Sequence, residues 1–100
     1  MRVTLQYFDG CPNWKETEAH LETLRSEGLD VILDRHLIDT PEAAEQHGFR
    51  GSPTVLIDGV DPFADRNAPV GLSCRVYQTE TGFGGSPSLD QLRAALRGAT

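Results

Sequence analysis

Apolar and polar residues alternate at the start of the chain and then change to a helical spacing. Residues 2–8 carry apolar side chains at every second position, which predicts a β-strand. Pro12 suits the first position of a helix, and apolar positions with helical spacing continue to about Ser26, before Gly28. Residues 31–39 predict a second strand. Thr40 and Pro41 then predict the start of a short helix that Gly48 ends.

The second half of the chain continues the alternation of strands and helices. Residues 54–58 predict a third strand, and a long connection over residues 59–71 leads to a fourth strand at residues 72–78. Glycines at 82, 84 and 85 indicate a loop, and Ser88 with Gln91 indicates a capping box that opens a final helix. The order β-α-β-α-β-β-α predicts one α/β domain over residues 1–100, with a four-stranded mixed sheet flanked by helices.

Charge and hydropathy exclude several classes of function. The net charge of −6 and the absence of any Lys/Arg cluster argue against a nucleic-acid surface. No apolar run approaches the length of a membrane span, and the charged, alternating start does not resemble a signal peptide. We therefore expect a cytoplasmic protein with neither a nucleic acid nor a membrane as partner. In that compartment two cysteines indicate chemistry or no role, rather than a structural crosslink.

Cys11 lies where the first strand gives way to the first helix. At a helix start the backbone N–H groups of Asn13 and Trp14, with the positive end of the helix dipole, favour a thiolate. Such positions lower the pKa of a cysteine from about 8.5 toward 7 or below. Cys11 is therefore a candidate nucleophile. The alternative is a buried, inert cysteine that fills space under Trp14.

Two short segments give the chain a resemblance to a known family. Cys11-Pro12 follows the first strand, and Gly51-Ser52-Pro53-Thr54 precedes the third. With the order of elements, they resemble the thioredoxin fold of thioredoxins and glutaredoxins. The resemblance implies that Cys11 is the nucleophile, that the Ser52–Pro53 bond is cis and faces it, and that the Ser52 backbone can pair with an extended peptide or glutathione. The alternative is a loop proline that starts an edge strand.

The chain also departs from that family. Trp14 stands where dithiol members place their second cysteine. The resemblance then implies a single-cysteine enzyme that uses an external resolving thiol such as glutathione and holds no cofactor. The segments Cys-Pro-Asn-Trp and Ser-Cys-Arg-x-Tyr are also similar to those of short thioredoxin-domain proteins that are loosely described as alkylmercury-lyase-like.

Cys74 is the second thiol of the chain and a candidate partner for Cys11. In the expected strand order the third strand separates the first from the fourth, so two strand spacings of roughly 10 Å in all lie between the cysteines. A disulfide needs Cα atoms within about 7 Å. Geometry therefore argues against a bridge, unless the 59–71 connection lets Cys74 approach. The alternative is a half-buried strand cysteine, with Arg75 pointing to the surface.

Several residues flank the expected site. Arg50 is a candidate for binding a glutathione carboxylate, and Asp9 for accepting a proton, although a solvated or turn position explains both equally well. Trp14 is expected to shield one side of the site. The three histidines show no metal-ligand spacing, so no metal site is expected.

Three functions compete on these observations. The first is a thiol–disulfide oxidoreductase or transferase that acts on protein or small-molecule disulfides and thiols. The second is a soft-metal or organomercurial thiol-binding protein that uses Cys11 and Cys74, with Asp9 as a proton donor. The third is a non-catalytic binding module of the same fold. We favour the first.

Overall fold

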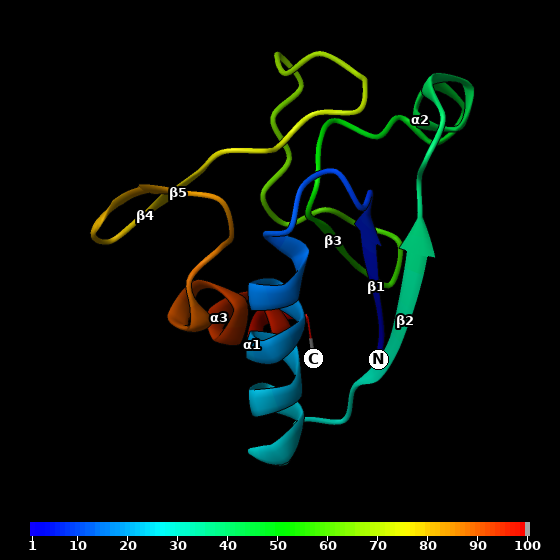
Figure 1. Cartoon of the computed structure of the whole chain (residues 1–100). Coiled ribbons are helices and arrows are strands. Elements are labelled where there is room, and N and C mark those ends of the chain that lie inside the picture. Colours follow the sequence, from blue (N-terminus) through cyan, green and yellow to red (C-terminus); the bar gives the residue numbers. More distant parts are fainter. Residues whose placement is uncertain (100) are drawn as a thin grey trace.

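The structure is a computed structural model, and it describes residues 1–99. Three helices and five strands follow one another in a mixed α/β arrangement (Figure 1). The strands are β1 (Arg2–Tyr7), β2 (Ile32–Leu37), β3 (Thr54–Ile57), β4 (Tyr77–Thr79) and β5 (Gly82–Gly84). The helices are α1 (Trp14–Ser26), α2 (Pro41–His47) and α3 (Leu89–Gly98). The α/β class predicted from the sequence is confirmed.

The main sheet has three strands in the order β2-β1-β3. The first two strands are parallel, with Arg2 opposite Ile32 and Tyr7 opposite Leu37. The third strand is antiparallel to β1, with Val3 opposite Ile57. The end of β1 therefore lies beside the start of β3. Cys11 follows β1 and Pro53 comes directly before β3, so both lie at the same edge of the sheet.

The prediction of a fourth strand in this sheet was wrong. Only the end of the predicted strand 72–78 is regular, and β4 pairs with β5 in a separate two-stranded hairpin. Sequence reasoning took residues 82–84 for a loop because glycine is unfavourable in strands. Gly82 adopts a φ of 125°, which glycine reaches without the strain that a side chain would cause, and this permits the tight turn.

Two of the three helices cover one face of the main sheet. Helices α1 and α3 pack on the face that carries Val3 and Leu5, and burial of this apolar surface is the main stabilising contribution (Figure 1). The core there also includes Leu21, Leu24, Val55, Leu92 and Leu96. The opposite face carries polar contacts, among them Gln6 Nε2 with His36 Nδ1 at 3.3 Å.

Local signals set the ends of the helices. Thr40 caps α2 by accepting the Ala43 N–H, and Gly48 ends it at a φ of 63°. Ser88 and Gln91 form the predicted capping box of α3. Helix α1 begins at Trp14 rather than at Pro12, because Pro12 and Asn13 form a preceding turn in which the Lys15 N–H donates to the Pro12 carbonyl at 3.1 Å.

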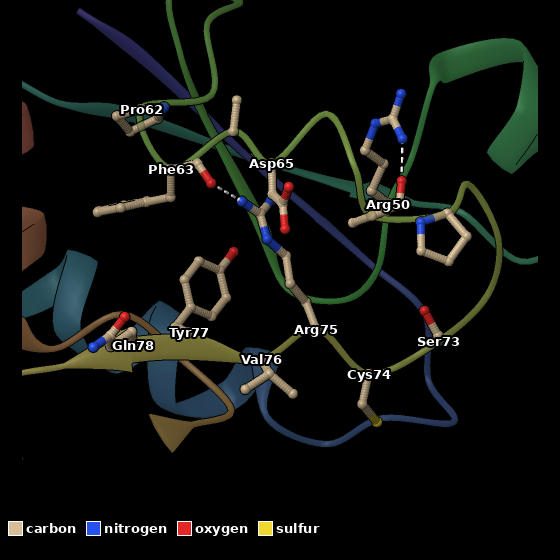
Figure 2. A pocket seen from close by; sticks show the side chains of 13 residues that line it. Arg50, Pro62, Phe63, Asp65, Ser73, Cys74, Arg75, Val76, Tyr77 and Gln78 are labelled. Atoms are coloured by element: carbon tan, nitrogen blue, oxygen red, sulfur yellow. Dashed lines mark hydrogen bonds between the residues drawn. The ribbon is translucent and has the colours of Figure 1, made fainter. Parts of the chain in front are cut away.

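Residues 71–76, which we call the Cys74 segment, cross over the loop that precedes β3. The Gly71 N–H donates to the Phe49 carbonyl at 3.0 Å, and the Ser52 N–H donates to the Ser73 carbonyl at 2.8 Å. Next, the Arg75 side chain reaches inward and donates to the Phe63 carbonyl (Figure 2). The segment is thus fixed by hydrogen bonds along its length, and it carries Cys74 toward the turn after β1.

Candidate functional site: the Cys11–Cys74 disulfide

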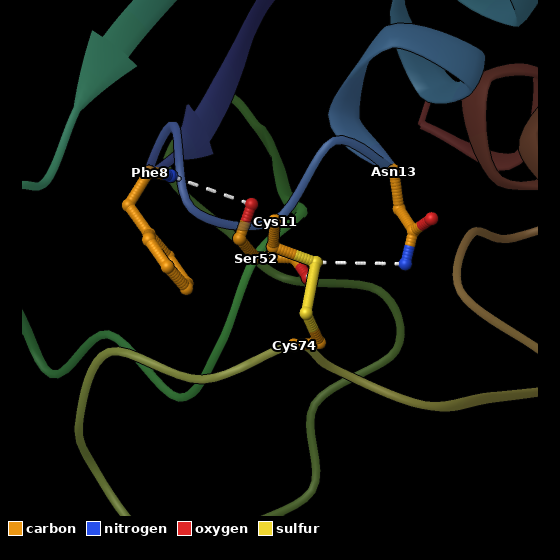
Figure 3. Close-up of a disulfide and its surroundings, with 5 residues drawn as sticks. All are labelled: Phe8, Cys11, Asn13, Ser52 and Cys74. Carbon is orange, nitrogen blue, oxygen red and sulfur yellow. Dashed lines mark hydrogen bonds between the residues drawn. A yellow bond between two sulfur atoms is a disulfide. The ribbon is translucent and has the colours of Figure 1, made fainter.

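Cys11 and Cys74 form a disulfide in the structure (Figure 3). Their Cα atoms lie 5.7 Å apart, within the usual range for a disulfide. The sequence-based distance argument against this bridge was wrong. It assumed that Cys74 lay on a sheet strand beyond β3, whereas the Cys74 segment leaves the sheet and lies across Ser52.

The predicted cis bond between Ser52 and Pro53 is present. Pro53 is buried, and the Ser52 carbonyl oxygen lies 3.8 Å from the Cys11 sulfur. The loop before β3 therefore faces Cys11, as the family resemblance implied. The Ser52 hydroxyl accepts the Phe8 N–H at 3.4 Å, which ties this loop to the turn after β1.

The backbone of Ser52 was expected to be open to a substrate, but in the structure it is already bonded within the chain. Its N–H donates to the Ser73 carbonyl, and its carbonyl accepts the Arg75 N–H, each at 2.8 Å. Ser52 and Cys74 thus form a parallel bridge. The chain's own Cys74 segment occupies the position that an added peptide strand would take.

Arg75 anchors the Cys74 segment. The prediction that Arg75 points to the surface was wrong. Its side chain is 8% exposed and pairs with Asp61 at 2.7 Å. It also donates to the Thr54 hydroxyl at 3.2 Å and to the Phe63 carbonyl. Residues 74–78 alternate between exposed and buried, with Cys74 outward and Arg75 inward.

Gly51 is the residue that lets the segment come this close. A Cβ atom at position 51 would lie 3.0 Å from the Arg75 Cβ and 3.2 Å from its backbone nitrogen. The φ of Gly51 is 121°, a conformation that side chains disfavour. Sequence reasoning named Ser52 and Pro53 in this motif and missed the role of the glycine before them.

The two sulfur-bearing residues differ in their surroundings. Cys11 is fully buried, whereas Cys74 is exposed. The Asn13 side-chain Nδ2 donates to the Cys11 sulfur at 3.5 Å (Figure 3). The sequence analysis expected backbone N–H groups to hold this sulfur and did not identify the Asn13 amide. Asparagine two residues after a helix-start cysteine is the signal that could have indicated it.

Within residues 1–99 neither sulfur is hydrogen-bonded to the other candidate residues, Asp9, Pro12, Trp14 and Arg50. Asp9 and Pro12 are exposed in the turn between β1 and α1. Trp14 packs against Tyr7, with ring centroids 4.5 Å apart, and under the Arg35 guanidinium. Arg50 donates to the Ala68 carbonyl and so braces the 59–71 connection. The roles assigned to these residues stay predictions.

A cavity of about 480 Å³ lies between the 59–71 connection and the Cys74 segment. Arg75 and Tyr77 point into it, while the Cys74 sulfur points away toward the turn after β1 (Figure 2). Cys74 lines this cavity together with Arg75 and Tyr77, so the cavity adjoins the segment that carries the disulfide.

We expect Tyr77 to make the stability of the folded protein depend on pH. Burial raises the pKa of Tyr77 well above its ordinary value of about 10, and its hydroxyl donates to the Pro53 carbonyl. The Tyr77 hydroxyl ionises readily only in the unfolded chain. Its contribution to the free energy of unfolding is therefore complete below pH 10 and is lost as the pH rises further. We expect the free energy of unfolding to fall by about 1.4 kcal/mol between pH 9 and pH 11 from this group.

Urea unfolding at the two pH values measures this effect. Tyr77→Phe is expected to remove that part of the pH dependence, although it also loses the hydrogen bond to Pro53. An equal decline in the two proteins would show that Tyr77 is not its source.

Within residues 1–99 no helix is long and apolar enough to cross a membrane. The same residues contain no group of three or more His, Cys, Asp or Glu side chains that could hold a metal ion. Comparison with family models, with curated proteins and with solved structures found no match for this chain.

Proposed function

We propose that the protein is a thioredoxin-like thiol–disulfide oxidoreductase whose redox centre is the Cys11–Cys74 pair. The observation that carries the proposal is the disulfide between a buried cysteine in the turn before α1 and an exposed cysteine held across a cis-proline loop. Cys74 takes the role that the sequence-based hypothesis gave to an external resolving thiol. The three-stranded order β2-β1-β3 supports the family resemblance, although the strand expected beyond β3 has left the sheet.

The hydrogen bonds around Cys74 support a reversible couple. Ser73 and Arg75 are both bonded to Ser52, and Arg75 is paired with Asp61, so several contacts besides the disulfide hold the segment in place. After reduction the two thiols stay near each other, and the disulfide can form again without a large rearrangement. Reduction by two external thiols gives two protein thiols and one external disulfide, a two-electron exchange, and the reverse reaction oxidises a substrate dithiol.

The partners that fit this chemistry are protein or small-molecule thiols and disulfides. Glutathione is the external thiol that we propose as reductant, and no bound cofactor takes part. A cytoplasmic location, which we also propose, would supply glutathione and keep the couple cycling rather than locked as a structural crosslink.

Glutathione-dependent reduction of a fluorescent peptide disulfide tests this function. We expect the wild-type protein to accelerate the exchange, and Cys11→Ser and Cys74→Ser each to lose at least about tenfold of that rate, because each removes one half of the couple. Full activity in Cys74→Ser would support the single-cysteine mechanism instead. No acceleration by the wild type, with intact folding, would favour a non-catalytic binding module.

A second function is favoured by one observation, the approach of Cys74 to Cys11. In the reduced state two neighbouring thiolates provide the soft ligands that mercury and similar cations prefer. On this hypothesis the reduced wild type binds one Hg(II) in competition with a small dithiol, and Cys74→Ser binds it much more weakly. Equal binding by the two proteins would exclude a shared site.

A further inference from the structure

We propose that exchange at the disulfide is directional: an external thiolate attacks Cys74, and Cys11 leaves as a thiolate that the Asn13 side chain stabilises. Gly85 is the residue whose missing side chain lets Asn13 reach the sulfur. This inference rests on the proposed function.

The direction follows first from burial. Cys11 is 0% exposed, whereas Cys74 is exposed on the outer side of its segment. An external thiolate must reach the sulfur that it attacks, so access selects Cys74. The Cys74–Cys11 bond breaks and a bond between the external sulfur and Cys74 forms. The electron pair of the broken Cys74–Cys11 bond passes to the Cys11 sulfur, which becomes a thiolate without any proton transfer.

The direction follows also from the stability of the leaving group. A thiol that is more stable as a thiolate leaves faster. The Asn13 amide already donates to the Cys11 sulfur at 3.5 Å, and a hydrogen bond to a negatively charged acceptor is stronger than one to a neutral sulfur. The Ser52 carbonyl, 3.8 Å from the same sulfur, can only accept a hydrogen bond and so favours the protonated thiol. Asn13 is therefore the side chain that favours departure.

The Asn13 side chain fits closely against Gly85. A Cβ atom at position 85 would lie 2.2 Å from Asn13 Nδ2 and 2.5 Å from its Cγ, which no real side chain can tolerate. Alanine at this position must displace the Asn13 amide, and the amide can move because it ends a flexible side chain. Gly85 is thus a positioning residue that acts through Asn13. Gly84 offers a matched control, because a Cβ there meets only the Ser86 carbonyl at 3.8 Å.

The first test maps the mixed disulfide. Oxidised wild-type protein is mixed briefly with glutathione, quenched with excess iodoacetamide and digested for mass spectrometry. We expect glutathione on Cys74 and the alkyl group on Cys11. Glutathione found mainly on Cys11 would overturn the proposed direction. A disulfide that does not exchange at all would instead overturn the proposed function on which this inference rests.

The second test is the pH profile of Cys11 alkylation in the reduced protein. In Asn13→Ala and Gly85→Ala we expect the apparent pKa of Cys11 to rise by roughly one unit, so that a smaller fraction of Cys11 is thiolate at neutral pH. Gly84→Ala and Asn67→Ala, an exposed asparagine, are expected to leave the profile unchanged. Circular dichroism checks that each variant is folded.

Two results would contradict the roles of Asn13 and Gly85 in stabilising the Cys11 thiolate. One is an Asn13→Ala profile equal to that of the wild type, and the other is a Gly85→Ala profile equal to that of Gly84→Ala. Either can occur while the wild type still exchanges with glutathione, so this inference can fail without the proposed function failing.

Discussion

Replacing Cys74 with serine is expected to lower the free energy of unfolding of the oxidised protein by about 4 kcal/mol. The disulfide joins residues 63 positions apart, so it restricts a large part of the unfolded chain, and the stabilisation from this restriction grows with loop length. Urea denaturation under non-reducing conditions measures the difference.

Two controls separate the crosslink from the substitution. Fully reduced wild-type protein should unfold at nearly the urea concentration that unfolds Cys74→Ser, because both lack the disulfide. Cys11→Ser should lower the free energy of unfolding somewhat more than Cys74→Ser does, because it also places a hydroxyl in a fully buried site. If oxidised wild type and Cys74→Ser unfold at the same denaturant concentration, the bridge does not form in solution.

Replacing Arg75 with leucine is expected to cost about 3 kcal/mol of stability. Removing this guanidinium leaves the Asp61 carboxylate without its partner, and the Asp61 side chain is only 20% exposed. The substitution also removes the donors to Thr54 and Phe63 that hold the Cys74 segment against the loop before β3. Urea denaturation measures the loss, and Arg66→Leu, at an exposed position of the same region, is the matched control.

The same variant has a second expected consequence. With its anchor gone, the Cys74 segment moves more freely in the reduced protein, and we expect the disulfide to re-form several-fold more slowly after oxidation by oxidised glutathione. The Arg66→Leu control should re-form it at the wild-type rate. Unchanged stability and unchanged re-formation in Arg75→Leu would contradict the anchoring role of Arg75.

Most elements of the fold could be predicted from the sequence because their signals are local. The alternation in residues 2–8, the cap at Thr40 and the capping box at Ser88 each depend on neighbouring residues, and each appears in the structure at the expected place. The fourth strand could not be predicted correctly. Its pairing depends on the path of the long 59–71 connection that precedes it. Nothing in the local sequence distinguishes a strand of the main sheet from one in a separate hairpin.

The site too has features that could be predicted from the sequence and one that could not. Cys11 and the cis bond before Pro53 could be predicted from short motifs at element boundaries. The partnership with Cys74 could not, because it follows from hydrogen bonds between Ser52 and residues 73 and 75 that are remote in sequence. The sequence did indicate that Cys74 and Arg75 point to opposite sides, and the structure turns Arg75 inward to Asp61 and Cys74 outward.

The most direct test of the central claim, that Cys11 and Cys74 form a reversible redox couple, is an equilibrium titration in glutathione buffers of increasing oxidation. Samples are quenched with acid and alkylated, and the state of each cysteine is read by mass spectrometry. We predict a single two-electron transition from two alkylated cysteines to one intramolecular Cys11–Cys74 disulfide. Separate glutathione adducts on the two cysteines under the most oxidising conditions, with no linked Cys11–Cys74 peptide, would contradict the account.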